Sequence, residues 1–202
     1  MDELAATTDR AAKIDHGFLR RIGPMLAGDD PAQGESLHGG GELMKKESFS
    51  FDDGNAYEAT MAAWLRPVGE TFFDWLEAKS GLKWIDVGCG TGVSTELLIE
   101  KCTPAEVEAL DPSNAQLAVA RTRPVLHDVT FHNGDAVALP FSDNSFDAAL
   151  MAGVIPVLPD LSKGVIEMLR VVRPSGLVAA YMWDIVNGGF PHEPVLAGLT
   201  GC

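Results

Sequence analysis

Four residues in one short segment have the types and spacing needed to hold a small ligand. Glycines stand at alternate positions, Gly88, Gly90 and Gly92, and Asp86 comes two residues before the first of them. Glycine permits tight turns and lets a ligand lie against the main chain, because it has no Cβ atom. A carboxylate at position 86 suits a cationic group, such as an amino-acid ammonium, better than a pyrophosphate. The segment therefore indicates a ligand that carries positive charge.

The spacing of these glycines differs from that of two common phosphate-binding motifs. Dinucleotide-binding loops read GxGxxG, whereas residues 88–92 read GxGxG. A P-loop needs GxxxxGK[ST], which this sequence lacks. The glycine loop alone does not identify the ligand, and an NAD-dependent oxidoreductase stays as a less favoured alternative.

Two further acids follow later apolar runs. Asp111 comes 19 residues after Gly92 and could accept hydrogen bonds from both hydroxyl groups of a ribose, a role that NAD enzymes also use. Asp135, in the sequence Gly134-Asp135-Ala136, could accept a hydrogen bond from the exocyclic amine of an adenine. These acids can act together only if the fold brings the ends of their apolar runs to one edge.

The surrounding pattern predicts the elements that would do so. Short apolar runs predict five strands, and apolar residues at helical spacing predict helices between them. The strands are expected at residues 83–87, 106–110, 129–132, 146–151 and 177–183, and the helices at 93–101, 114–121 and 161–172. A turn is expected at residues 174–176, before the last strand. This alternation predicts an α/β fold with a doubly wound parallel sheet, which binds ligands at the carboxyl ends of its strands.

The region before the first strand has a helical pattern with one expected interruption. Tyr57, Met61 and Trp64 begin an apolar stripe at helical spacing. Pro67 is expected to break or kink this helix, and a second helical segment is expected to end at Lys79. On periodicity alone, Tyr57 and Trp64 are as consistent with core residues as with ligand contacts.

Composition restricts the function classes. The 202 residues carry a net charge of −14, which argues against a protein that grips nucleic-acid backbones. No stretch is long and apolar enough to span a membrane, and the acidic first residues, which have no apolar core, are not expected to be a signal peptide. The three cysteines have no metal-binding spacing and are interpreted as reduced thiols of a cytoplasmic protein, so no metal site is predicted. Residues 1–43 are predicted to be an N-terminal extension, with a helix at residues 4–26 and a flexible linker at 28–43.

Four motifs together resemble the class I S-adenosylmethionine-dependent methyltransferases, near the small-molecule group that includes the ubiquinone and menaquinone methyltransferases. They are DVGCGTG at 86–92, ALDPS at 109–113, NGDAVALPFSDNSFD at 133–147 and LRVVRPSG at 169–176. The resemblance covers residues 57–192 and implies a Rossmann-like fold, S-adenosyl-L-methionine as cofactor and a small organic molecule as methyl acceptor. The fourth strand is not followed by DPPY or NPPY, which argues against amino-methylating DNA enzymes.

The resemblance also implies the site residues. Glycines of the loop would contact the methionine moiety, Asp86 its ammonium, Asp111 the ribose, and Asp135 with Ala136 the adenine. The implied cofactor contacts are Asp86, Gly88, Cys89, Gly90, Gly92, Asp111, Pro112, Asp135, Ala136, Met151 and Tyr57, with Ala152, Gly153 and Trp64 nearby. No catalytic residue is assigned. His127, His132 and His192 are candidate bases, although a lone histidine is more often a structural residue.

The chain departs from the family pattern at its end. Residues 44–202 are predicted to form a methyltransferase domain that lacks the last two strands of the family fold, which leaves strand 177–183 as an apolar edge. Three explanations stay open: a truncated product, a homodimer that covers this edge, or replacement of the strands by residues 1–43. The alternative to an active enzyme is accordingly a chain that binds cofactor without turnover and acts as a remnant or an interaction module.

Overall fold

The computed structural model describes residues 63–182, with side chains from Leu65 onward. Predictions that concern the rest of the chain lie outside the described residues. They include the helix at 4–26, the linker at 28–43, the cofactor contact at Tyr57, the candidate base His192 and the side chain of Trp64.

The described residues form one parallel five-stranded sheet, as the sequence predicts. The strands are β1 (Lys83–Val87), β2 (Glu106–Asp111), β3 (Thr130–Asn133), β4 (Phe146–Ala152) and β5 (Val172–Tyr181). Their order in the sheet is β3-β2-β1-β4-β5, and every neighbouring pair is parallel. The chain moves outward from β1 to β3 and then returns to β4 on the other side of β1. A reversal of strand order of this kind opens a crevice at the carboxyl ends of the strands.

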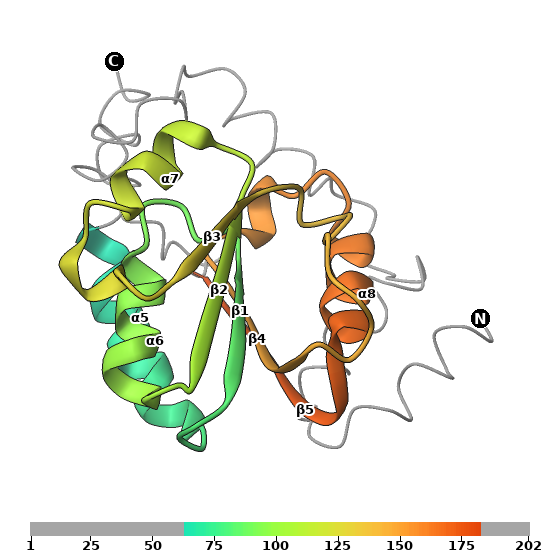
Figure 1. The fold of residues 1–202 in the computed structure, drawn as a ribbon, viewed down its shortest axis with the longest axis horizontal. Helices are drawn as coiled ribbons and strands as arrows, with labels where there is room; N and C mark the ends of the chain where they lie inside the picture. Colours follow the sequence, from blue (N-terminus) through green and yellow to red (C-terminus); the bar gives the residue numbers. More distant parts are fainter. Residues whose placement is uncertain (1–62, 183–202) are drawn as a thin grey trace, which may run out of the picture.

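Helices cover both faces of this sheet. Helices α5 (Ala63–Leu76) and α6 (Val93–Cys102) lie on one side, and α8 (Leu161–Val171) lies on the other (Figure 1). Helix α7 (Asn114–Ala120) follows β2, and the short 3-10 turns η2 (Pro124–Leu126) and η3 (Ile155–Val157) complete the connections. The predicted helices at 93–101, 114–121 and 161–172 are therefore confirmed to within one residue at each end.

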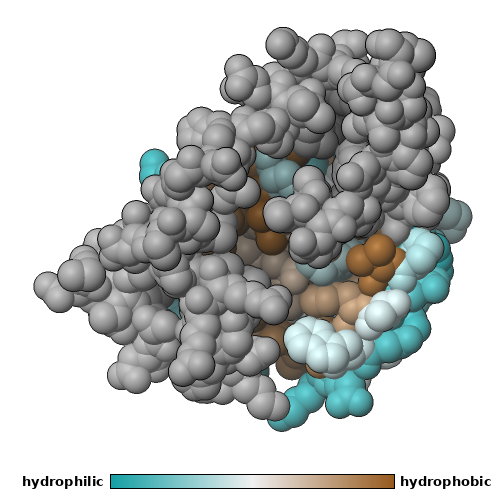
Figure 2. Space-filling view, turned by 180° about the vertical axis from the view of Figure 1, so that it is seen from behind, coloured by the Kyte–Doolittle hydropathy of each residue, from teal (hydrophilic) through white to brown (hydrophobic). Residues whose placement is uncertain are grey.

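Two apolar layers form because side chains alternate across the strands. On the α5 and α6 side, Trp84 packs with Leu97 and Leu98, and all three are fully buried. On the α8 side, Ile85 and Met168 are equally buried in a second cluster. Viewed from behind, the molecule shows an apolar area bordered by hydrophilic residues (Figure 2). No helix of the described residues is long and apolar enough to cross a membrane.

Pro67 was predicted to break or kink the helix, and the break is wrong, because α5 continues through this residue. The helix ends at Leu76 rather than at Lys79. Proline removes the hydrogen bond to the carbonyl four residues earlier. That carbonyl belongs to Ala63, the first described residue of α5. The Thr71 hydroxyl donates a hydrogen bond to the Pro67 carbonyl at 3.2 Å, one turn later in the same helix.

The start of β5 also differs from prediction. The sequence predicts a turn at residues 174–176 before the strand, but β5 already begins at Val172 and contains this segment. Its pairing with β4 is irregular, since Phe146 faces Val172 whereas Ala148 faces Leu177. The turn is therefore an irregularity inside the strand.

Candidate functional site

The glycine loop between β1 and α6 has the tight geometry that its sequence predicts. Gly88, Gly90 and Gly92 have φ angles of +77°, +54° and +87°. Residues with a side chain rarely adopt this left-handed backbone region, whereas glycine does so at little cost. The amides of Gly88 and Cys89 both donate to the Leu110 carbonyl, at 2.7 and 3.0 Å, so the loop is fixed to the end of β2.

Two of these glycines make room for the protein's own side chains. A Cβ atom on Gly88 would lie 2.4 Å from Cγ2 of Val154, which follows β4. A Cβ atom on Gly92 would lie 2.5 Å from Cδ1 of Leu126 in η2. The sequence suggested that missing Cβ atoms leave space for a ligand. At these two positions the space is used by Val154 and Leu126, which the sequence does not place near the loop.

Asp86 is completely buried behind the loop. The Thr95 hydroxyl donates to its Oδ2 at 2.7 Å, whereas Oδ1 has no hydrogen-bond partner among the described residues. Burial raises the pKa of Asp86 to about 7; the bond from Thr95 opposes this shift and the charge of Asp111 adds to it. A carboxylate oxygen without a partner in a low-dielectric setting is costly, and a positive charge placed nearby would stabilise it.

Asp111 links the end of β2 to the glycine loop. Its Oδ2 accepts from the Gly90 amide and its Oδ1 from the Ser113 amide, both at 2.8 Å. Burial raises the pKa of Asp111, and these two hydrogen bonds lower it. No spacing in the sequence indicates this contact between Asp111 and the loop. Each carboxylate oxygen can accept a second hydrogen bond, so the contact is compatible with the predicted binding of ribose hydroxyls.

Asn133, the last residue of β3, is a positioning residue that sequence analysis missed. Its side-chain amide donates to the carbonyls of Asp111 and Pro112, at 3.2 and 2.8 Å. The Gly134 amide donates to the same Asp111 carbonyl at 3.2 Å. The end of β3 is thereby joined to the β2 turn. Only the place of an asparagine at a strand end could have suggested this role.

The predicted adenine residues begin the connection from β3 to β4. Asp135 is exposed, and its Oδ1 accepts from the Val137 amide at 3.1 Å. Ala136 is buried in the core on the α8 side. The Asp135 carboxylate is therefore accessible to a ligand, whereas Ala136 holds the backbone of this segment against the core.

The remaining predicted cofactor contacts among the described residues differ in burial and in the groups that they expose. Met151 is buried in the core on the α8 side, so it can contribute to a ligand site only through its backbone. Gly153 donates from its amide to the Tyr181 carbonyl at 2.8 Å, and Pro112 is exposed beside Asp111. Cys89 packs with Ala109 and Leu117, and burial raises the pKa of its thiol well above the usual range. A thiol in this setting is a poor nucleophile.

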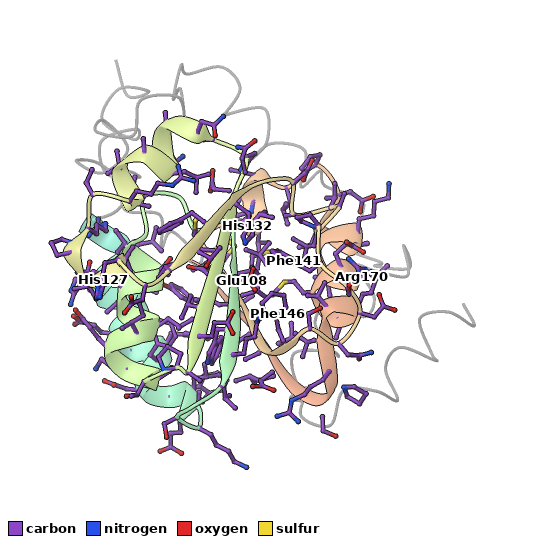
Figure 3. The ribbon with its side chains drawn as sticks, in the orientation of Figure 1. Glu108, His127, His132, Phe141, Phe146 and Arg170 are labelled. Carbon is purple, nitrogen blue, oxygen red and sulfur yellow. The ribbon has the colours of Figure 1, made fainter. Side chains whose placement is uncertain are left out.

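The described candidate bases are engaged elsewhere. His127 is exposed, with Nδ1 3.0 Å from the Pro124 carbonyl and Nε2 3.0 Å from Asp128. The Nε2 atom of His132 lies 2.8 Å from Glu108, far from His127 (Figure 3). Within residues 63–182, no group of histidines, cysteines and acids could hold a metal ion.

Residues 85–180 match the family model described as "Methyltransferase domain". The demethylmenaquinone methyltransferase of Desulfitobacterium hafniense (strain Y51) is 40% identical over 110 residues, covering 52% of this chain and 44% of that protein. The chloroplastic 2-methyl-6-phytyl-1,4-hydroquinone methyltransferase 2 of Oryza sativa subsp. japonica is 41% identical over 96 residues, covering 48% of this chain and 28% of that protein. The chain thus spans less than half the length of these two relatives.

Solved structures agree on the fold. The SAM-dependent methyltransferase of Thermotoga maritima superposes with a TM-score of 0.50 at 25% identity, over 61% of this chain and 56% of that one. The geranyl diphosphate C-methyltransferase of Streptomyces coelicolor A3(2), crystallised with S-adenosyl-L-homocysteine, gives a TM-score of 0.50 at 22% identity, over 58% and 44%.

The sheet order, the glycine loop and the acids at the strand ends define a Rossmann-like domain of the class I, S-adenosylmethionine-dependent methyltransferases. Residues 85–180, a little under half of the chain, resemble this methyltransferase family, and the two relatives above are also named as methyltransferases. The family resemblance predicted from the four motifs is thereby confirmed, and the family's cofactor is S-adenosyl-L-methionine.

Proposed function

We propose that this protein transfers a methyl group from S-adenosyl-L-methionine to a small organic acceptor. The observation that carries the proposal is the buried, unpartnered Oδ1 of Asp86 behind a left-handed glycine loop that Asp111 holds in place. The cofactor, when bound, supplies an activated methyl group on a positively charged sulfonium, and it also carries an ammonium. The residues present fit such a ligand, because Asp86 and Asp111 are buried carboxylates, and a positive charge beside a buried carboxylate stabilises its ionised form.

In this proposal each residue binds one part of the cofactor. Asp86 stabilises the ammonium across a short gap or through a water molecule, since its own carboxylate is completely buried. Asp111 binds the ribose with the free acceptor capacity of its carboxylate, and Asp135 with Ala136 frames the adenine. Backbone groups supply further contacts at Gly88, Cys89, Gly90, Gly92, Pro112 and Met151, with Tyr57 closing over the cofactor.

The acceptor is proposed to be a small molecule with an acidic or electron-rich nucleophile. Two relatives are named for a menaquinone precursor and a hydroquinone, which supports this class. Such nucleophiles need little help from a general base, and the described histidines make contacts elsewhere. The protein's contribution is then alignment of acceptor and cofactor within a site that excludes water.

Three further properties belong to the proposal. We expect residues 44–202 to act as the methyltransferase domain, with residues 1–43 as an extension. We expect a cytoplasmic protein that does not bind nucleic acid, in keeping with its net charge of −14. We expect a homodimer that covers β5, which is an outer strand of the described sheet. Light scattering at several concentrations would test the dimer, and a concentration-independent monomer mass would contradict it.

Calorimetric titration with S-adenosylhomocysteine tests the cofactor site. We expect micromolar binding by the parent chain and loss of binding in Asp86→Asn, while circular dichroism shows that both are folded. Asp128→Asn is the matched control, because Asp128 is exposed and pairs only with His127 among the described residues. Release of S-adenosylhomocysteine from S-adenosylmethionine across phenolic and hydroquinone acceptors then tests turnover. Binding without release would favour the inactive alternative, and a response to NAD instead would favour the oxidoreductase.

A further inference from the structure

The connection from β3 to β4, residues 134–145, has no helix or strand to hold it. It nevertheless begins with Asp135 and Ala136, which the proposed function places beside the adenine. Hydrogen bonds within the connection link its first residues in series. Asp135 accepts from the Val137 amide through its side chain and from the Ala138 amide through its carbonyl, both at 3.1 Å. The position of Asp135 is therefore coupled to whatever holds the next residue, Leu139.

A single guanidinium on α8 holds the second half of this connection. Arg170 donates to the carbonyls of Leu139 and Phe141, at 3.0 and 2.7 Å, and to the Asp143 carboxylate at 2.9 Å. Its two remaining N–H groups donate to Glu167, at 2.7 and 2.8 Å. All five donors of the guanidinium are thus used, which no lysine could reproduce. Figure 3 shows Arg170 on α8 with Phe141 beside it.

Glu167 completes the arrangement from the same helix. One of its carboxylate oxygens accepts from the Leu139 amide at 2.7 Å while also accepting from Arg170. The hydrogen bond from Arg170 lowers the pKa of Glu167, which keeps this carboxylate ionised. The Arg170 carbonyl accepts from the Asn144 amide at 3.0 Å. Backbone groups at three places along the connection are therefore fixed by two neighbouring residues of α8.

Apolar packing alone would leave the connection less constrained. Leu139 is buried, and the Phe141 ring lies edge-on to Phe146 with centroids 5.1 Å apart. Such contacts hold a segment against the core but direct it weakly, because hydrophobic contact is not directional. Hydrogen bonds are directional, so the planar Arg170 guanidinium, with all its donors in use, fixes the orientation of the connection.

We propose that Glu167 and Arg170 are positioning residues for the adenine end of the cofactor site. They touch no cofactor; they hold residues 139–144 so that Asp135 and Ala136 keep a fixed place at the start of the same connection. This inference rests on the proposed function, because it assumes that Asp135 accepts a hydrogen bond from the adenine amine.

The test compares two ligands in three variants of the full chain. S-adenosylhomocysteine has the amine that Asp135 would accept from, and S-inosylhomocysteine lacks it. We expect the parent to prefer the adenine ligand about tenfold, the value of one hydrogen bond to a carboxylate. Arg170→Lys and Glu167→Gln should each reduce this preference to about threefold or less. Arg173→Lys is the matched control, because the Arg173 side chain pairs with Asp147 of β4 and, among the described residues, has no hydrogen bond to residues 134–145.

The ratio of the two affinities separates positioning from stability. A variant that only destabilises the fold weakens both ligands alike and leaves the ratio unchanged, and that result would overturn the proposal. Glu167→Gln, the smaller change, decides the matter if Arg170→Lys fails to fold. A parent chain that binds both ligands equally would also overturn it, while leaving the proposed function intact. A parent that binds neither would overturn both. Hydrogen exchange should show faster exchange over residues 137–144 in both variants but not in the control.

Discussion

The carboxylate of Asp111 accepts a hydrogen bond from the Gly90 amide at 2.8 Å, which joins the end of β2 to the middle of the glycine loop. The same carboxylate is the predicted ribose contact. We therefore expect both cofactor affinity and the order of the glycine loop to depend on this one side chain.

Asp111→Ala should consequently weaken cofactor binding and also reduce the order of the glycine loop. We expect S-adenosylhomocysteine to bind more weakly by about 1.5–3 kcal/mol, the range for hydrogen bonds to a charged group. We also expect a lower melting temperature without ligand, because the Gly90 and Ser113 amides lose their acceptors. Calorimetry and thermal unfolding measure the two effects. A calorimetric affinity equal to that of the parent would refute the ribose role.

Asp86→Asn should stabilise the ligand-free protein at high pH. The folded pKa of about 7 lies above the unfolded value of about 3.9, so the folded state holds this proton more tightly. The stabilising contribution is fully present below about pH 4 and is lost as the pH rises through 7, by up to about 1.4 kcal/mol per pH unit. Asparagine does not titrate, so the advantage of Asp86→Asn should grow between pH 5 and pH 8. Urea unfolding at both pH values measures it, and an unchanged difference would count against the raised pKa.

Cofactor binding should depend on pH through the same residue. A cation beside Asp86 favours the ionised carboxylate, so binding should release a proton whenever Asp86 begins protonated. Below pH 7 we expect the affinity for S-adenosylhomocysteine to fall, approaching about tenfold per pH unit. Calorimetry in buffers of different ionisation enthalpy counts the released proton. In Asp86→Asn any residual binding should not vary with pH, and a flat profile in the parent would contradict the role of Asp86.

Gly88→Ala should be more costly than Gly81→Ala. Both glycines have positive φ angles, +77° and +75°, so an alanine is strained at either position. Only at position 88 would the new Cβ also meet Val154, at 2.4 Å, because nothing lies within 4 Å at position 81. We expect the extra destabilisation to be about 1–3 kcal/mol, the usual cost of overpacking.

Adding Val154→Ala to Gly88→Ala should recover most of that extra cost but none of the φ strain. Denaturant unfolding of the two single variants and the double variant measures the recovery. Equal losses at positions 88 and 81 would show that Val154 adjusts without cost.

The sequence alone determined the order of the elements and the chemistry of the loop. Strand β1 was predicted to the residue, and strands β2, β3 and β4 and helices α6, α7 and α8 came within one residue at each end. This is possible because strand and helix periods, and the need for glycine at positive φ, are local properties of the backbone. The four motifs at 86–92, 109–113, 133–147 and 169–176 also indicated the family, through their combined resemblance to it.

Tertiary structure decided which residues surround that loop. Val154 and Leu126 occupy the spaces beside Gly88 and Gly92, and Arg170 reaches carbonyls about thirty positions earlier in the chain. No spacing in the sequence predicts these contacts, because they form only when separate strands and helices pack against one another. The break predicted at Pro67 was wrong for a related reason: packing of an amphipathic helix outweighs the loss of the one hydrogen bond that a proline removes. Short-range sterics therefore determined the elements, and long-range packing determined how the site is held.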